Sequence, residues 1–241
     1  LESEVVSLSL AGRLMTKRVM GKAAFAHVRD ESGDIQIYAQ RDSLPEGIYN
    51  GLFKKLDLGD IIGVEGTLFR TRTGELTVNI TNIRLLVKAL RPMPEKYHGL
   101  TDIETRYRQR YVDLLANQDS KEVFRKRART MASLRQFLDA RDYLEIESPI
   151  MQAIPGGANA KPFITHHHAL GVDLYLRVAQ ELAIKRCLVG GFEKVYELNR
   201  NFRNEGLSTQ HNPEFTMLEY NEAYKDFNDY MNLTEEMLRE V

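Results

Sequence analysis

The chain has 241 residues, enough for one large domain or two modest ones, with 43% hydrophobic and 28% charged residues. Its formal net charge is −1, its single cysteine excludes an internal disulfide framework, and no apolar run approaches the roughly 18 residues of a membrane span. No signal-peptide pattern is present, so we expect a protein of the reducing cytoplasm without a membrane partner. Because the first residue is Leu1, we also expect the natural start to be missing.

Charge is distributed unevenly along the chain. Nine Lys or Arg lie between Arg106 and Arg135, whereas nine acidic residues against two basic ones follow from Glu205 to the end. This asymmetry is typical of a protein that meets an anionic partner over part of its surface. Ordinary solvated helix faces would explain it equally well.

Residues 5–87 have the pattern of a small β barrel. Strand-like segments lie at 5–15, 24–28, 35–39, 61–69 and 76–86, and one short amphipathic helix is predicted at 48–56. Three strands, a helix and two strands is the order of an OB-fold, which often binds oligonucleotides. We therefore predict an OB-fold domain over residues 1–87 and favour oligonucleotide binding over a purely structural barrel.

The second half has a mixed pattern. Residues 88–104 contain Pro92, Pro94 and Gly99 and predict a linker. The elements predicted beyond it are a long helix ending near 141–142, a strand at 143–150, a loop at 154–158, a helix at 179–189, paired strands at 194–203 and 213–220, and a final amphipathic helix. These elements favour an α+β domain with antiparallel pairing over residues 105–241.

The paired strands of this domain concentrate chemically capable side chains. Arg203 and Glu205 would point the same way if their strand persists that far, and Phe215 and Glu219 share a face of the next strand. An arginine fork suits phosphate or carboxylate oxygens and can stabilise charge developing at phosphorus. A carboxylate can accept a hydrogen bond from the amino group of adenine, and an aromatic ring can stack on the base. These groups predict a nucleotide site.

Two motifs carry a family resemblance. Phe-Arg-Asn-Glu at 202–205, with His-Asn-Pro-Glu-Phe-Thr-Met at 211–217, resembles motif 2 of class II aminoacyl-tRNA synthetases. The helix–strand segment ending in Pro149 resembles their motif 1, which packs against a partner subunit. Longer blocks make the whole chain similar to bacterial lysyl-tRNA synthetases; they lie at 89–92, 96–100, 106–111, 154–158 and 162–167.

The resemblance implies a multi-domain α+β protein, in which an OB-fold barrel precedes the front half of a class II synthetase antiparallel α/β catalytic domain. It implies a lysine–tRNA ligase, in which the lysine carboxylate attacks the ATP α-phosphorus and tRNA(Lys) then takes the lysyl group from the adenylate. The parent would be a homodimer through motif 1. Mg²⁺ would assist, with ligands expected beyond residue 241, so we expect no metal site and no synthetase activity in residues 1–241 alone.

Site residues follow from the same resemblance. Arg203 would be the catalytic group, gripping the α-phosphate and the lysine carboxylate. ATP would be bound by Arg203, Glu205, His211, Asn212 and Phe215. Lysine would be bound by Gly157, Glu181, Arg203 and Glu219, and two carboxylates suit a substrate with two ammonium groups. Anticodon bases would be read by Phe25, Gln36 and Glu75, with Arg13, Lys17 and Arg18 nearby.

Two residues depart from the family pattern. Gln180 stands where the family commonly has proline, which we expect to alter only the start of the following helix. Asn221 stands where a tyrosine often contacts the lysine side chain. Neighbouring strand residues face opposite ways, so Tyr220 cannot simply replace that tyrosine. The lysine pocket is therefore where this chain differs from the family.

Other interpretations remain open at the level of sequence. A synthetase for aspartate or asparagine would share the barrel and motif 2, although Glu219 argues against an acidic substrate. A nucleic-acid-binding module with a non-catalytic second half is a second alternative, and a paralogue that attaches lysine to a protein is a third. We interpret Cys187 as a core residue. The run His166, His167 and His168 is not expected to bind a metal ion, because consecutive strand residues cannot all face one ion.

Overall fold

The structure is a computed structural model that describes residues 6–94 and 100–241, so residues 95–99 of the predicted linker lie outside it. The chain divides into two compact units, residues 1–121 and 122–241. The first therefore includes residues that the sequence assigned to the catalytic domain from residue 105 onwards. The functional boundary at residue 105 stays a prediction.

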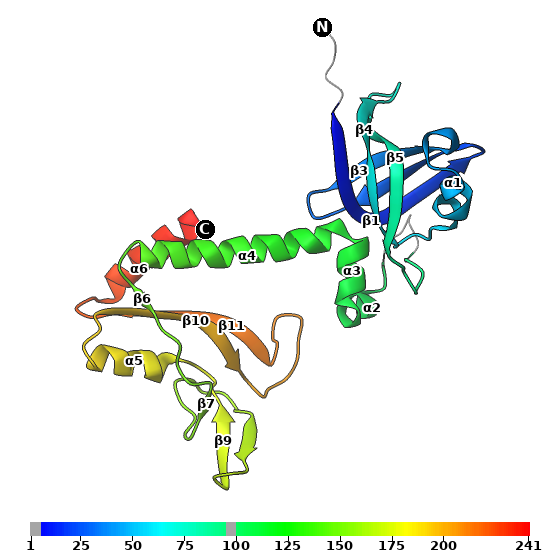
Figure 1. The fold of residues 1–241 in the computed structure, drawn as a ribbon. Coiled ribbons are helices and arrows are strands. Elements are labelled where there is room, and N and C mark those ends of the chain that lie inside the picture. The colour runs from blue at the N-terminus through cyan, green and yellow to red at the C-terminus, as the bar shows by residue number, and fades with distance from the viewer. Residues whose placement is uncertain (1–5, 95–99) are drawn as a thin grey trace. The chain divides into compact units, whose positions relative to one another are not determined.

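The first unit contains a closed five-stranded barrel with the strand order β1-β2-β3-β5-β4 (Figure 1). Its strands are β1 (Ser7–Met20), β2 (Ala23–Arg29), β3 (Asp34–Gln40), β4 (Ile61–Arg70) and β5 (Leu76–Val87). All neighbours pair antiparallel except β3 and β5, which pair parallel. The predicted OB-fold is confirmed, and β1 runs five residues further than the expected end at Met15.

Alternation fixes which side of each barrel strand faces inward. In β2, Ala24, Ala26 and Val28 are buried, whereas the residues between them are partly exposed. Gly66 lies where β4 comes closest to β5, and a Cβ there would sit 2.2 Å from the carbonyl oxygen of Asn79. No side chain fits at that distance, so glycine is required for this close approach.

The single helix predicted at 48–56 is wrong in detail. The structure has a one-turn helix α1 (Ile48–Gly51) followed by the 3-10 turn η2 (Phe53–Lys55). The break at Leu52 leaves the rings of Tyr49 and Phe53 stacked, with centroids 5.7 Å apart, and both side chains are fully buried in the barrel core. Packing of these two rings takes precedence over continuing the helix.

Two short helices, α2 (Ile103–Arg108) and α3 (Arg110–Ala116), surround one buried carboxylate. Asp113 is completely buried and accepts hydrogen bonds from Arg106 Nε at 2.8 Å, Arg110 Nη1 at 2.5 Å and Asn117 Nδ2 at 2.7 Å. Burial alone would raise the pKa of Asp113, but these donors hold it far below its ordinary value. Part of the basic cluster seen in the sequence therefore serves an internal ion-pair network.

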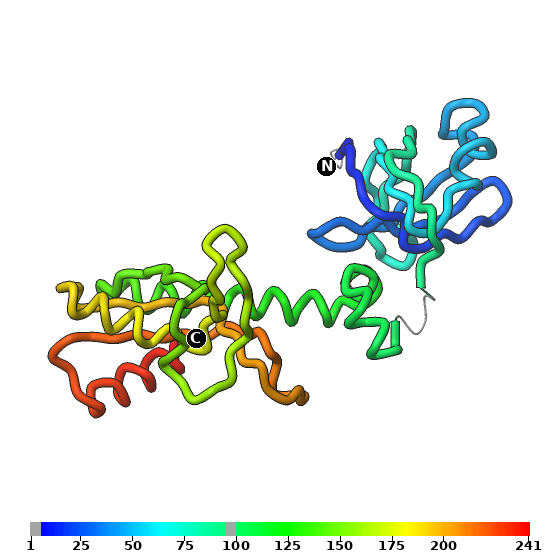
Figure 2. The backbone as a smooth tube through the Cα atoms, turned by 90° about the horizontal axis from the view of Figure 1, so that it is seen from below, coloured from blue at the N-terminus to red at the C-terminus, as the bar shows by residue number. Residues whose placement is uncertain are grey.

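The second unit begins within the long helix α4 (Gln118–Asp139) and contains two small sheets. One has the order β11-β10-β6 and the other the order β7-β9-β8. The remaining elements are β6 (Leu144–Glu145), β7 (Met151–Gln152), β8 (Ile164–His167), β9 (Val172–Leu176), α5 (Glu181–Val189), β10 (Lys194–Phe202), β11 (Glu214–Glu222) and α6 (Phe227–Glu240). The backbone tube shows the long excursion between β10 and β11 (Figure 2).

The strand predicted over 143–150 is wrong in length, because only Leu144 and Glu145 pair with β10. Beyond them Ser148 binds the carboxylate of Glu197 through both its backbone N–H and its hydroxyl, at 3.2 and 2.6 Å. These bonds draw the chain off the sheet edge, and Met151–Gln152 then pairs with β9 instead.

The β10–β11 pair has two distinct faces, which position the site. Even-numbered Tyr196, Leu218 and Tyr220 pack with Leu134, Phe137 and Leu138 of α4 and with Leu233 and Met237 of α6. The odd-numbered residues point to the opposite side, where α5 runs along the sheet (Figure 1). One face is thus an apolar core, and the other is free to carry polar chemistry. Within the described residues no helix is long and apolar enough to cross a membrane.

Candidate functional site

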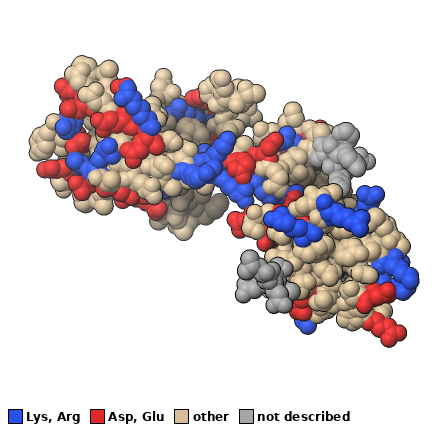
Figure 3. Space-filling model, turned by 90° about the horizontal axis from the view of Figure 1, so that it is seen from above, with Lys and Arg blue, Asp and Glu red and all other residues tan. Residues whose placement is uncertain are grey.

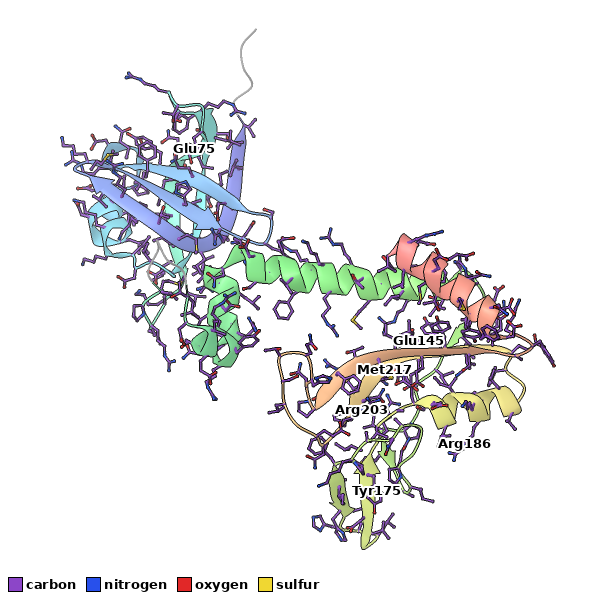
Figure 4. All side chains as sticks on the ribbon, turned by 180° about the vertical axis from the view of Figure 1, so that it is seen from behind. Glu75, Glu145, Tyr175, Arg186, Arg203 and Met217 are labelled. Carbon is purple, nitrogen blue, oxygen red and sulfur yellow. The ribbon has the colours of Figure 1, made fainter. Side chains whose placement is uncertain are left out.

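A pocket of about 530 Å³ lies where β10 and β11 separate. It is lined by Arg203, Glu205, Gly206, Gln210, His211, Asn212, Pro213 and Phe215, so all five predicted ATP residues meet there. Figure 4 places Arg203 at this end of the pair, beside the strand that carries Met217. The strand β10 ends at Phe202, so Arg203 and Glu205 do not share a strand face as the sequence suggested.

Arg203 is held by a backbone hydrogen bond, a side-chain hydrogen bond and an aromatic ring. Its N–H donates to Pro213 O at 2.8 Å, its Nε lies 3.4 Å from Val178 O, and its guanidinium carbon lies 5.2 Å from the centroid of Phe215. Among the described residues, neither terminal nitrogen of this guanidinium has a hydrogen-bond partner. The side chain is therefore oriented and retains donors for an anion such as phosphate or carboxylate.

The loop residues of the pocket are held by one long-range hydrogen bond and several local ones. Glu205 Oε1 accepts a hydrogen bond from Lys161 N at 3.3 Å, which ties the loop to the segment before β8. The Nδ1 of His211 lies 2.8 Å from Ser208 Oγ, and the same two residues exchange backbone bonds of 3.2 and 3.3 Å. These contacts form a compact turn that exposes His211 and the neighbouring Asn212 to the pocket.

A second group of predicted residues lies on the α5 side of the sheet. Gly157 has a positive φ of 90°, and a Cβ there would lie 3.4 Å from Glu181 Cβ and 3.8 Å from Glu181 Oε2. Glu181 starts α5 and forms an ion pair with Lys185 one turn later. Glu219 of β11 lies close enough to Glu181 for the two charges to interact. The structure thus brings these three predicted lysine-binding residues together.

Glu219 is the electrostatic centre of this group. Burial raises its pKa, and the nearby carboxylates of Glu181 and Glu197 raise it further, while Arg177 and Lys185 oppose them. Its Oε2 is buried and has no hydrogen-bond partner among the described residues. A buried acceptor left unpaired is costly, so this oxygen is suited to receive a donor, ideally a cationic one.

Sequence reasoning missed a buried ion pair beneath Glu219. Glu197 pairs directly with Glu219 across the strands and binds Arg177 Nη1 at 2.7 Å, with both side chains buried. Arg177 also donates to Arg200 O at 2.9 Å and Ser148 Oγ at 2.8 Å. The sequence did contain one sign of it: Glu197, Asn199 and Asn201 are polar residues two apart, so they share one face of the predicted strand. Arg177 compensates Glu197, which leaves Glu219 as the uncompensated carboxylate.

Gln180 does more than alter the start of α5. Its side chain is completely buried, and its Nε2 donates to Glu197 O at 2.6 Å and Met217 O at 3.2 Å. Its Oε1 accepts from Asn201 Nδ2 at 3.2 Å. The side chain therefore fastens the first turn of α5, including Glu181, to both strands. A proline could make none of these bonds.

Asn221 lies two residues beyond Glu219 on the same strand face. Tyr220 faces the other way: its ring stacks on Tyr230 with centroids 5.4 Å apart, and its hydroxyl bonds Thr234 Oγ1 at 2.5 Å. Tyr220 therefore cannot reach the carboxylate group on the α5 side, in agreement with the alternation argument.

The predicted anticodon residues share the outer surface of the barrel. Phe25 of β2 is partly exposed, and its ring lies 4.8 Å from that of Tyr38 on β3. Gln36 donates to Glu75 Oε2 at 2.8 Å, and Glu75 stands at the barrel end, just before β5 (Figure 4). A cavity of about 560 Å³ on this surface is lined by Met15, Thr16, Arg18, Met20, Phe25, His27, Arg29, Asp34 and Gln36.

The basic residues expected near Phe25 divide into two groups. Arg18 lines the cavity, but Arg13 donates to Gly59 O at 2.7 Å and Lys17 donates to Lys54 O at 2.9 Å. Arg13 and Lys17 thus bind the loop before β4, and they do not line the outer cavity. On the viewed faces acidic and basic side chains lie interspersed (Figure 3).

Other candidate residues are placed as follows. His166 bonds Asp173 Oδ1 at 2.8 Å across the β8–β9 hairpin, and Cys187 is half-buried on α5. Within residues 6–94 and 100–241, no group of three or more His, Cys, Asp or Glu side chains is arranged to hold a metal ion. The role of Mg²⁺ stays a prediction.

Comparison with known proteins agrees with this geometry. Residues 102–241 match the model of class II tRNA synthetases (D, K and N), and residues 8–86 match the OB-fold nucleic acid binding domain. The chain is 62% identical to the lysine–tRNA ligase of Thioalkalivibrio sulfidiphilus over 100% of its own length and 48% of that relative. It is 60% identical to the heat-inducible lysine–tRNA ligase of Escherichia coli K12 over 99% of its length and 47% of the relative.

The chain therefore spans about half the length of the curated relatives it matches. Identity of this degree over the whole chain, together with the matching barrel and motif 2 pocket, fixes the family. The chain belongs to the class II tRNA synthetases, as a homologue of the bacterial lysyl-tRNA synthetases.

Proposed function

We propose that this chain carries the anticodon-binding barrel and one wall of the ATP and lysine sites of a lysine–tRNA ligase. The proposal rests on two features of the β10–β11 pair. The Arg203 guanidinium lies over the Phe215 ring, and among the described residues its terminal nitrogens have no hydrogen-bond partner. The buried Glu219 Oε2, on the strand face that also carries Phe215, likewise has none.

The first step needs groups for three parts of the reactants. Arg203 would bind the lysine carboxylate and the α-phosphate together, which brings the attacking oxygen to phosphorus and stabilises the charge that develops there. Phe215 and Glu205 would hold the adenine ring. No covalent enzyme nucleophile is needed. Mg²⁺ would offset charge on the phosphates.

Selection of lysine would rest on carboxylates. Glu181 would meet the α-ammonium and Glu219 the side-chain ammonium, because Glu197 is already compensated by Arg177. When a substrate without a cationic group binds, the buried carboxylate oxygen stays unpaired. Such a pocket rejects that substrate more strongly than an apolar pocket could. Aspartate would add a carboxylate to a site whose own carboxylates are mutually repulsive.

The proposal also covers transfer of the lysyl group to tRNA(Lys) and the quaternary structure. The barrel would bind the tRNA(Lys) anticodon through Phe25, Gln36 and Glu75. The parent would dimerise through the region resembling motif 1, where Val123 of α4 is 65% exposed and Phe124 48% exposed. Apolar side chains this exposed on a helix are typical of an interface.

The test is amino-acid-dependent ATP–pyrophosphate exchange by the full-length polypeptide. Exchange should require lysine, and Arg203→Ala should lower its kcat/KM by about 100-fold or more, the scale of losing a donor to a transition-state charge. Arg200→Ala is the matched control, since Arg200 lies three residues earlier and, among residues 6–94 and 100–241, its side chain is partnered only by Glu214, 3.6 Å away. Exchange that proceeds equally with aspartate, or that survives in Arg203→Ala, would contradict the proposal.

A further inference from the structure

A hydrogen-bonded chain of five side chains crosses the outer surface of the barrel. Thr16 Oγ1 lies 2.8 Å from His27 Nδ1, and His27 Nε2 lies 3.0 Å from Glu75 Oε1. Glu75 Oε2 accepts from Gln36 Nε2 at 2.8 Å, and Gln36 Oε1 accepts from Thr77 Oγ1 at 2.8 Å. The chain joins β1, β2, β3, β5 and the residue before β5.

The chemistry of the groups fixes the direction of each bond. An ionised carboxylate only accepts, so both His27 Nε2 and Gln36 Nε2 must donate to Glu75. In the neutral ring His27 Nδ1 is then an acceptor, and the Thr16 hydroxyl donates to it. Thr16 therefore selects the imidazole tautomer that carries its proton on Nε2, towards Glu75.

His27 differs in its hydrogen bonding from a residue that reads a base. Its ring is bonded on both nitrogens by protein groups, so it has no remaining polar edge for a base. In register it lies opposite Gln36 on the neighbouring strand. Its side chain is 34% exposed and that of Glu75 is 46% exposed, so the bond contributes little to stability but restricts where the carboxylate can lie.

Glu75 needs such a restraint because it follows a turn. The turn is closed by Gly74 N–Thr71 O at 2.9 Å and by Glu75 N–Thr71 Oγ1 at 3.1 Å, which fix the backbone and leave the carboxylate to rotate. With His27 on one oxygen and Gln36 on the other, the carboxylate has one orientation. Each oxygen still has a lone pair for a ligand.

From this arrangement we infer that His27 is a positioning residue for anticodon recognition, with Thr16 setting its tautomer. His27 touches no base; it holds the Glu75 carboxylate ready for the nucleotide that Glu75 reads. The inference rests on the proposed anticodon role of the barrel. It predicts that His27 governs discrimination between bases more than overall RNA affinity, because phosphate contacts supply most of the latter.

The experiment measures binding of the 241-residue chain to a set of RNA stem-loops. One is the anticodon stem-loop of tRNA(Lys), and the others carry one replaced anticodon base each. His27→Ala should lower the preference for the natural loop about tenfold, the loss of a hydrogen bond to a charged group, and leave affinity for the replaced loops unchanged. His27→Gln, which can still donate to Glu75, should restore part of the preference.

Thr16→Val supplies a second variant that leaves the imidazole in place. It should lower the preference by a smaller factor, and ¹⁵N NMR of His27 should show a mixture of tautomers where the unaltered chain shows one. Thr81→Val is the matched control, because within the described part of the chain the Thr81 hydroxyl bonds only Glu65 O, at 3.3 Å, on another part of the barrel. If His27→Ala fails to fold, Thr16→Val decides the question by itself.

The outcomes distinguish the positioning role of His27 from the anticodon role of the barrel. Unchanged preference in a folded His27→Ala chain, or in Thr16→Val with one tautomer retained, overturns the positioning role. Equal binding of natural and replaced loops by the unaltered chain overturns the anticodon proposal itself. An equal loss of affinity for every loop in His27→Ala also overturns the inference, since it would make His27 a general RNA contact.

Discussion

At the scale of single residues, the carboxylate of Glu219 shows how a binding group is placed at a cost to the folded state. Its raised pKa comes from burial and from the negative charges of Glu181 and Glu197. A carboxyl whose pKa is raised on folding favours the folded state fully below its ordinary value of 4.5, and that contribution is lost as pH rises through the raised value. At neutral pH the raised pKa of Glu219 therefore makes the folded state less stable than it would be with an ordinary glutamate.

Glu219→Gln should accordingly raise the melting temperature at pH 7, and the difference should vanish near pH 4. The same change should abolish lysine binding, because an amide offers no charge to an ammonium group. Thermal unfolding across this pH range and calorimetric titration with lysine would measure both effects. Glu214→Gln on the same strand is the control, since Glu214 is 55% exposed. A less stable Glu219→Gln at pH 7 would show that our account of the site is wrong.

At the scale of elements, α5 is fastened to the sheet by the side chain of Gln180. The amide bonds backbone carbonyls on both β10 and β11 and accepts from Asn201, all in a fully buried position. Glu181 follows directly, so the position of its carboxylate depends on this anchor. The helix starts with no side-chain cap of its own, which makes the anchor more important.

Gln180→Leu should destabilise the second unit by about 1–3 kcal/mol, because buried partners lose their bonds and are not resolvated. Urea denaturation of the 241-residue chain would measure the change, and lysine affinity should fall with it. Gln136→Leu is the matched control, as Gln136 is exposed on α4 and its side chain has no hydrogen bond among the described residues. Equal stability of the two variants would mean that Gln180 does not anchor the helix.

At the scale of the whole molecule, the two units have separate cores. The barrel core runs from Leu14 to Ile83, and the core under α4 contains only residues from Leu134 onwards. No described residue belongs to both cores. Each unit therefore has its own source of hydrophobic stabilisation.

A fragment of residues 1–94 should fold on its own and unfold cooperatively, because every buried residue of the barrel core is inside it. Its melting temperature should match one of two transitions of the 241-residue chain, measured by calorimetry. It should also bind the anticodon stem-loop with the preference of the longer chain. A fragment that is unfolded, or one that binds without preference, would show that the barrel depends on residues beyond 94.

Local patterns in the sequence determined much of this protein. Alternation located the barrel strands and the pair β10–β11, and residue spacing placed Phe215 and Glu219 on one face. Motif 2 predicted a nucleotide site, and its five predicted residues line one pocket. These features were accessible because period-two alternation and short motifs are properties of neighbouring residues.

Only the tertiary structure decided the features that join distant segments. The Arg177–Glu197 pair, the anchor at Gln180 and the chain from Thr16 to Thr77 each connect residues far apart in sequence. Arg13 and Lys17 seemed available for RNA until folding placed carbonyl oxygens against them. A polar side chain is free or engaged according to which groups surround it after folding, and burial makes that difference large in energy. No local pattern contains this information, because the partners come from other strands.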